Sequence, residues 1–335
     1  MVGMGMLRSG WCAPIRLGAR MLAIGILLAA SAALLTGCGV LSAQLEAAST
    51  FAKSTSQLAD SAKSAYLQAG QDESTLRVVR YAVLGNPQDS PKLISAGNYQ
   101  KPLLNLMPSY ISIKGRLDAA AALSAYGQAL TALLDSKTQE GDLAAATDKF
   151  TAALKSIPAK DLTAAGIKTA EIDSAGAILK AFGNLYLDYR RREALEQVVP
   201  ATEPVVTKLC KMFRNDFDIL ADGQAFAQVY YNSTDNILTA VTRKLKSDAD
   251  SQGNGGDGLE RRAILLPMYM QVAAIKNKTK DTYATVKTAG ASCATASQTL
   301  ADSIKNPTVS LDDIIDFAKK ADAAYTAVTA FAAGK

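Results

Sequence analysis

Apolar side chains recur every three to four residues along nearly the whole chain beyond residue 40. This spacing places one apolar stripe on an α-helix, because a helix completes a turn about every 3.6 residues. Sustained alternation of apolar and polar residues, which would indicate half-buried β-strands, does not occur in the sequence. The pattern therefore predicts an all-α fold: a multi-helix bundle of about eight helices, mostly antiparallel to their neighbours because the loops are short.

The composition also favours helix over sheet. The sequence is rich in Ala, and aromatic residues make up 6% of it. Ala has the highest helix propensity, whereas β-branched and aromatic residues are enriched in strands. With 49% hydrophobic residues, the chain can bury a large core. We expect residues 38–335 to form a single helical domain.

Proline and glycine are expected to separate the helices. Pro200 and Pro204 are predicted to end one helix and precede the next, because proline lacks the N–H that continues a helix. Ser310 and Asp313 fit a capping box at the start of the last helix. The expected helices that depend most on such signals are 40–70, 72–84, 170–198, 203–221, 224–248, 259–289, 292–305 and 310–332.

The Gly-rich stretch 251–258 predicts a flexible loop between two helices. The residues around it partly resemble a calcium loop, in which several oxygens converge on the ion from a glycine-bent chain. The last acid falls one place too late and a glutamine replaces one ligand, so a solvated linker is preferred and no metal or cofactor is predicted. The residues concerned are Asp248, Asp250, Gln252, Gly253 and Glu260.

The first 37 residues have the layout of a secretory signal peptide. Arg8, Arg16 and Arg20 are followed by an uninterrupted apolar run from Met21 to Leu35. This run of about 15 residues is shorter than the roughly 20 that a transmembrane helix needs.

The apolar run ends in Leu35-Thr36-Gly37-Cys38, which resembles the lipobox of bacterial lipoproteins. The resemblance implies cleavage between Gly37 and Cys38, acyl chains on Cys38, and attachment of the mature chain to a membrane through that lipid. Gly39, in place of Asp, implies the outer membrane, with the protein facing the periplasm and surface exposure left open. An ordinary signal peptide or an uncleaved anchor would be the alternatives.

The sequence contains no histidine. Ser-His-Asp triads, Cys-His pairs and histidine-based metal sites are therefore excluded. An enzyme that relies on Asp, Glu, Lys, Tyr or Arg remains conceivable, but the sequence nominates no pair of such residues. We therefore predict that the protein is not an enzyme.

Charge gives no indication of nucleic-acid binding. The net charge is +5, but three of the arginines lie within residues 1–37, and the remainder carries only +2. One basic cluster could contact anionic lipid or an acidic partner, although a solvated helix surface paired with Glu193 and Glu196 is preferred. This cluster consists of Arg190, Arg191, Arg192, Lys208, Lys211 and Arg214.

Tyr186 and Tyr189 could line a ligand groove. They continue the helical spacing of Phe182, however, so a place in the core is preferred.

Cys210 and Cys293 are the two thiols that remain once residues 1–37 are removed and Cys38 is lipidated. Both lie on apolar helix faces, and small residues around Gly290 would permit two helices to approach closely. In an oxidising compartment, thiols within reach of each other form a disulfide. The sequence predicts this pairing, while two separate buried thiols remain the alternative.

Two functions follow as expectations. The first is a lipid-anchored, non-enzymatic scaffold or adaptor that binds other envelope components through its helix faces. The second is a helical module that holds a small ligand or lipid in an apolar cavity. The expected partners are the membrane, through the lipid on Cys38, and an envelope protein.

Overall fold

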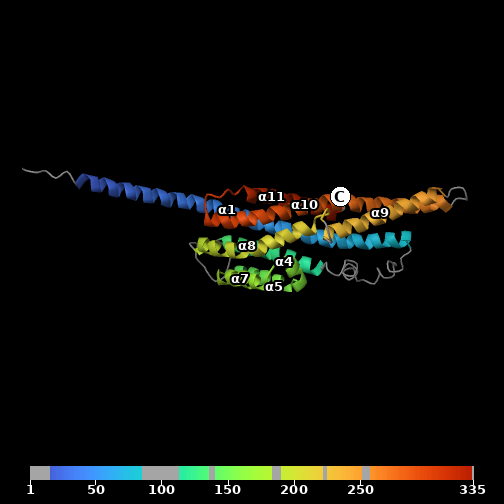
Figure 1. Ribbon diagram of the computed structural model, residues 1–335, viewed down its shortest axis with the longest axis horizontal. Helices are drawn as coiled ribbons and strands as arrows, with labels where there is room; N and C mark the ends of the chain where they lie inside the picture. The colour runs from blue at the N-terminus through green and yellow to red at the C-terminus, as the bar shows by residue number, and fades with distance from the viewer. Residues whose placement is uncertain are drawn as a thin grey trace, which may run out of the picture.

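The computed structural model describes residues 16–84, 113–135, 140–182, 190–221, 225–250 and 257–333. Every regular element within these ranges is an α-helix, which confirms the all-α prediction. The helices lie side by side in an elongated bundle, and α1 extends beyond it at one end (Figure 1). They are α1 (Arg16–Leu84), α4 (Ile113–Leu134), α5 (Glu140–Ser156), α6 (Ala159–Ala164), α7 (Thr169–Phe182), α8 (Arg190–Asp216), α9 (Phe226–Asp250), α10 (Asp257–Lys305) and α11 (Asp312–Ala332).

Packed neighbours run antiparallel where cross-contacts define their direction. Between α10 and α11, Ser292 donates a hydrogen bond to Asp316 at 3.0 Å, and Thr299 donates one to Asp313 at 2.7 Å. Residue numbers thus rise along one helix as they fall along the other. The pairs α1–α4, α8–α10 and α9–α10 show the same reversal, as the bundle prediction requires.

The predicted interruption of α1 near residue 71 is wrong, because the helix runs through Gly70 to Leu84. The apolar stripe stays in phase across the glycine, and Leu76 beyond it is fully buried. Gln68 also donates a hydrogen bond to the Asp72 carboxylate at 3.0 Å, one turn along the helix. Tertiary burial and this contact outweigh the low helix propensity of one glycine, which costs about 1 kcal/mol.

The predicted helix break at Pro200 and Pro204 is also wrong, since α8 continues through both prolines. Thr202 lies between them, and its hydroxyl donates to the carbonyl oxygens of Val198 and Val199 at 2.8 and 3.3 Å. These valines are buried, so packing holds the segment helical where backbone hydrogen bonds are missing.

α10 is likewise one helix of 49 residues rather than the two expected. The last helix begins close to its predicted start, but the capping box is not formed. Ser310 accepts a hydrogen bond from the backbone N–H of Asp312 at 3.2 Å, whereas the Asp313 carboxylate binds Thr299 of α10. A tertiary partner has replaced the local one.

Five aromatic rings form the centre of the bundle, with ring centroids 4.8 to 6.3 Å apart. They are contributed by α1, the end of α8, α9 and α10, and all are buried. Large side chains therefore fill the space where these helices meet. The five rings belong to Tyr66, Phe217, Phe226, Tyr230 and Tyr283.

Candidate functional site

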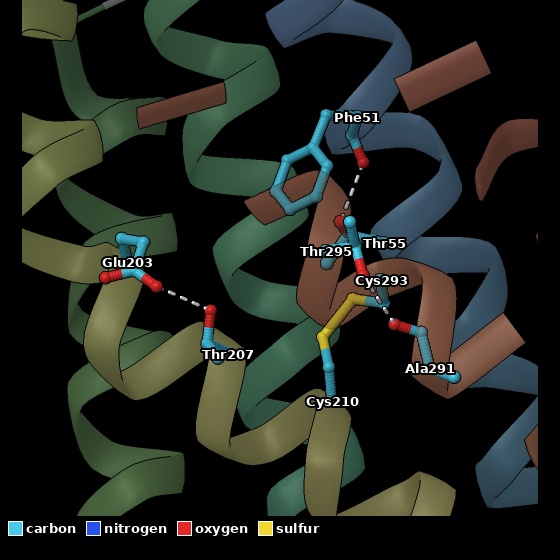
Figure 2. The surroundings of a disulfide bond; sticks show 8 residues. All are labelled: Phe51, Thr55, Glu203, Thr207, Cys210, Ala291, Cys293 and Thr295. Carbon is cyan, nitrogen blue, oxygen red and sulfur yellow. Dashed lines mark hydrogen bonds between the residues drawn. A yellow bond between two sulfur atoms is a disulfide. The ribbon is translucent and has the colours of Figure 1, made fainter. Parts of the chain in front are cut away.

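A disulfide joins Cys210 of α8 to Cys293 of α10 (Figure 2). The Cα atoms lie 5.7 Å apart, within the range that a disulfide bridges, and both residues are fully buried. The surrounding hydroxyl groups donate within their own helices: Thr55 to the carbonyl of Phe51 at 2.7 Å, and Thr207 to Glu203 at 2.7 Å. The bond lies in the core, with its polar neighbours already hydrogen-bonded, and acts as a link between the two helices.

Gly290 sets the separation of the two linked helices. A Cβ at this position would lie 2.9 Å from the backbone nitrogen of Arg214 and 3.1 Å from the carbonyl oxygen of Cys210. Backbone atoms cannot turn aside as a flexible side chain can, so only glycine permits this approach. The sequence-based expectation that Gly290 allows close contact agrees with this geometry.

Arg116 of α4 is the centre of a buried ionic network. Its guanidinium donates to both carboxylate oxygens of Asp216 in α8, from Nε at 2.8 Å and from Nη2 at 3.2 Å. Nη1 donates to Asp161 of α6 at 2.8 Å, and the Tyr66 hydroxyl of α1 donates to Asp216 at 2.8 Å. All four residues are buried, so the network connects four helices through charged groups.

The electrostatics of this network keep Arg116 charged. Burial opposes the positive charge, but Asp216 outweighs it and raises the pKa of Arg116 above its ordinary value. Burial and the Asp216 charge raise the pKa of Tyr66 well above its ordinary value, so the phenol stays a donor. Both carboxylates bind the same guanidinium and are nearly shielded from solvent. The arrangement places one guanidinium between two buried carboxylates and joins three helices, and it exposes neither acid to a substrate.

A second polar group lies beside the aromatic centre. Burial raises the pKa of the Asp72 carboxyl in α1, against the lowering effect of donors from Gln68 and Tyr230, the latter at 3.3 Å. The hydroxyl of Tyr283 is buried without a hydrogen-bond partner in the described part of the chain. Burial raises the pKa values of Tyr230 and Tyr283 well above their ordinary range.

The predicted cleavage site, Gly37 and Cys38, lies within the span of α1. Gln44, six residues after Cys38, is the first buried residue recorded in that helix, and its amide donates to the carbonyl of Ser303 in α10. Ala47 and Ala48 then enter the core. The helix that contains Cys38, the position where lipidation is predicted, is therefore the same helix that packs into the bundle. Within the described residues, no helix has a segment long and apolar enough to cross a membrane.

The structure describes part of the segment that partly resembles a calcium loop. Asp248 is buried in α9 and accepts an ion pair from Lys244 at 3.3 Å, and Glu260 lies on α10. Gln252, Gly253 and most of the predicted 251–258 loop lie outside the described residues. No group of metal-binding side chains occurs in the part of the chain that the structure describes.

The basic cluster of α8 is partly paired. Lys208 donates to both carboxylate oxygens of Glu171 in α7 at 2.7 Å, a partner that the sequence did not suggest. The side chains of Arg190, Arg191 and Arg192 are not described, and Tyr186 and Tyr189 lie outside the described residues.

An open groove of about 450 Å³ runs between α1, α4 and α5. Its floor is formed largely by alanines, and Asp60, Lys63 and Lys149 lie along it. Burial raises the pKa of Asp60, an effect that Lys63 partly offsets. The groove is polar at its edges and differs from the enclosed apolar cavity that a ligand-binding module was expected to contain.

Comparisons with known proteins supply no relative. No family description, no curated protein and no solved structure matches the chain.

Proposed function

We propose that the protein is a lipid-anchored, non-enzymatic component of a bacterial envelope, which acts as a scaffold or adaptor between the membrane and other envelope components. The lipid is carried by Cys38 after cleavage behind Gly37. Gly39 favours the outer membrane, with the bundle facing the periplasm.

The continuity of α1 carries this proposal. Gln44, only six positions after Cys38, already bonds to α10. Six residues of helix span about 9 Å. A lipid on Cys38 would hold the end of the bundle close to the membrane surface and restrict its orientation, as a scaffold requires, instead of leaving it on a long flexible tether.

Internal rigidity supports the same role. The Cys210–Cys293 bond links α8 to α10, and Arg116 binds carboxylates from α6 and α8. An oxidising periplasm favours such a disulfide. A scaffold must keep its shape, and the disulfide and the contacts of Arg116 both hold helices in fixed relative positions.

The non-enzymatic part of the proposal rests on the chemistry available. The sequence has no histidine, and the two buried acids of the network, Asp161 and Asp216, are held by Arg116 instead of facing the open groove. General acid–base catalysis needs groups within reach of a substrate.

The alternative, a helical module that binds a small ligand or lipid, is favoured by one observation: the groove of about 450 Å³ has the volume of a small-molecule site. Native mass spectrometry of the purified mature protein separates the two proposals. A co-purified compound other than the lipid on Cys38 would support the ligand-binding module, whereas the mass of the lipidated chain alone supports the scaffold.

The anchor is tested by Cys38→Ala. We expect uncleaved precursor in the inner membrane, because no diacylglyceryl-cysteine is available for cleavage and sorting. Cys12→Ala is the matched control, since Cys12 lies in the expected signal peptide and its loss should leave processing unchanged. Normal processing and outer-membrane location of the Cys38→Ala protein would contradict the proposal.

A further inference from the structure

Asp72 of α1 lies where α1, α9 and α10 meet. Its carboxylate accepts hydrogen bonds from the Gln68 amide at 3.0 Å and from the Tyr230 hydroxyl of α9 at 3.3 Å. Burial raises the pKa of this carboxyl, while the two hydrogen bonds and the charge of Lys278 in α10 lower it. A carboxylate offers about four acceptor positions, so two donors leave acceptor capacity on Asp72.

Tyr283 of α10 brings a fully buried hydroxyl group close to this carboxylate. The ring of Tyr283 lies 6.1 Å from the ring of Tyr230, measured between centroids, and burial followed by the charge of Asp72 raises the pKa of Tyr283. The Tyr283 hydroxyl has no hydrogen-bond partner among the residues that the structure describes. Buried polar groups in proteins are hydrogen-bonded to protein or to ordered water, so this hydroxyl calls for a partner.

Thr279 supplies a second hydroxyl of the same kind one helical turn earlier. It is fully buried, and its Oγ1 also has no partner in the described ranges. Buried Thr55 and Thr234, in contrast, donate to carbonyl oxygens of their own helices at 2.7 and 2.9 Å. Side chains of a helix lean toward its N-terminus, so the Tyr283 ring extends over the turn that contains Thr279. The two hydroxyls therefore lie on the same side of α10, next to Asp72.

The chemistry of these three groups restricts what can bind between them. A ligand must donate to the Asp72 carboxylate and accept from the two hydroxyls. A metal ion donates no hydrogen bond, and no group of three metal-binding acidic or cysteine side chains occurs in the described part of the chain. The neighbouring aromatic rings already contact one another, with centroids 4.8 to 6.3 Å apart, so the ligand must be very small.

We propose that Asp72, Thr279 and Tyr283 bind one internal water molecule, which accepts hydrogen bonds from the two hydroxyls and donates to the carboxylate. Internal waters make about three hydrogen bonds to buried polar groups that otherwise lack partners. The water links α1 to α10, and Tyr230 adds α9 to the same polar layer within the aromatic centre. A shift of one helix by a turn separates these groups, so the layer favours a single register of the three helices. The site is independent of the lipid on Cys38.

A crystal structure of the purified mature protein, at a resolution that shows ordered water, tests the site directly. We expect a water within hydrogen-bond distance of Tyr283 Oη, Thr279 Oγ1 and the Asp72 carboxylate. Asp72→Asn should keep this water, because the amide oxygen still accepts a hydrogen bond, whereas Asp72→Leu should lose it.

A mutant cycle tests the site in solution. Tyr283→Phe and Thr279→Val each remove one hydroxyl, and urea denaturation gives the equilibrium constant for unfolding. With the water bound, each change should raise this constant about fivefold, because a hydrogen bond is lost. The double change should raise it by less than the product of the two single effects, since both hydroxyls bind the same water. Without the water, each change removes a buried hydroxyl that has no partner, so the constant should stay the same or fall.

Tyr325 and Thr329 of α11 form the matched control, because they are a tyrosine and a threonine one turn apart on a helix surface. Both are exposed, and Thr329 donates to the carbonyl oxygen of Tyr325 at 2.8 Å. The effects of Tyr325→Phe and Thr329→Val should multiply, since the two side chains share no bound water.

Three results would overturn the proposal. The first is a crystal structure in which the Tyr283 hydroxyl donates directly to Asp72 with no water between them. The second is an unfolding constant that is unchanged or lowered in both Tyr283→Phe and Thr279→Val. The third is a coupling between Tyr325→Phe and Thr329→Val equal to that of the buried pair.

Discussion

Arg116 binds two carboxylates that lie 45 and 100 residues away along the chain. Nothing in the local sequence around Arg116, Asp161 or Asp216 distinguishes them from surface charges, because their significance arises only when three helices meet. Cys210 and Cys293 are different. Their number, their apolar faces and the expected compartment together limited the possible pairings, so the disulfide could be predicted from sequence.

Arg116→Met should lower the free energy of unfolding by about 3–5 kcal/mol, because it leaves two buried carboxylates without their cation. Urea denaturation followed by circular dichroism measures the loss. Arg243→Met on the exposed surface of α9 is the matched control and should change stability by no more than about 0.5 kcal/mol. A loss below about 1 kcal/mol for Arg116→Met would show that the network contributes little.

Buried tyrosines predict a loss of stability at alkaline pH. Burial raises the pKa of Tyr126 to about 12, against about 10 in an unfolded chain. Below pH 10 the phenol is protonated in both states and its contribution is fully present. Between pH 10 and 12 the unfolded state loses its proton first, so stability falls, by up to roughly 2.7 kcal/mol for a shift of two units.

Denaturation measured at a series of pH values tests whether the free energy of unfolding falls between pH 10 and 12. Tyr126→Phe should make the loss between pH 10 and 12 shallower, whereas Tyr325→Phe, at an exposed position of α11, should leave the slope unchanged. Equal slopes for the original protein and Tyr126→Phe would contradict the prediction.

The helices themselves were predictable because a period of about 3.6 residues needs only local sequence. Their ends were not. Proline and glycine do weaken a helix locally. Buried side chains on both sides of Pro200, Pro204 and Gly70 nevertheless kept α8 and α1 continuous. Packing on neighbouring helices is absent from a sequence pattern, so tertiary burial overrode propensity at these three positions.

Gly290→Ala should destabilise the protein by about 1–3 kcal/mol, because the added methyl group meets the backbone of α8. Gly176→Ala is the matched control, since its Cβ would meet only the side chain of Thr151, which can rotate. Both changes gain the same helix propensity, so the difference between their thermal midpoints isolates the helix contact. Equal midpoints would contradict the assigned close approach.

The Cys210–Cys293 disulfide joins α8 to α10. We therefore expect no titratable thiol in mature protein that is unfolded without reduction and carries a lipid on Cys38. Reduction, or the double change Cys210→Ala and Cys293→Ala, should cost roughly 4–5 kcal/mol in the chain-entropy description, because the bond closes a long loop with a sequence separation of 83. Two titratable thiols would show that the bond does not form in the cell.

As a whole, the molecule is an elongated bundle whose two ends differ in chemistry. One end holds Gln44 and Ser303 close to Cys38, and the other carries the exposed apolar side chains Leu259, Leu266 and Met270 of α10. α10 alone, with 49 residues, spans about 73 Å. The fold class was predictable from sequence. The location of these exposed side chains at the end remote from Cys38 required the structure.

The mass of the N-terminal peptide of the purified mature protein tests the anchor most directly. We predict a blocked N-terminus at Cys38 that carries a diacylglyceryl group and an amide-linked acyl chain, or the diacylglyceryl group alone where the third chain is not added. An unmodified Cys38, in a cleaved or an uncleaved chain, would contradict the lipid anchor and with it the proposed role at the membrane.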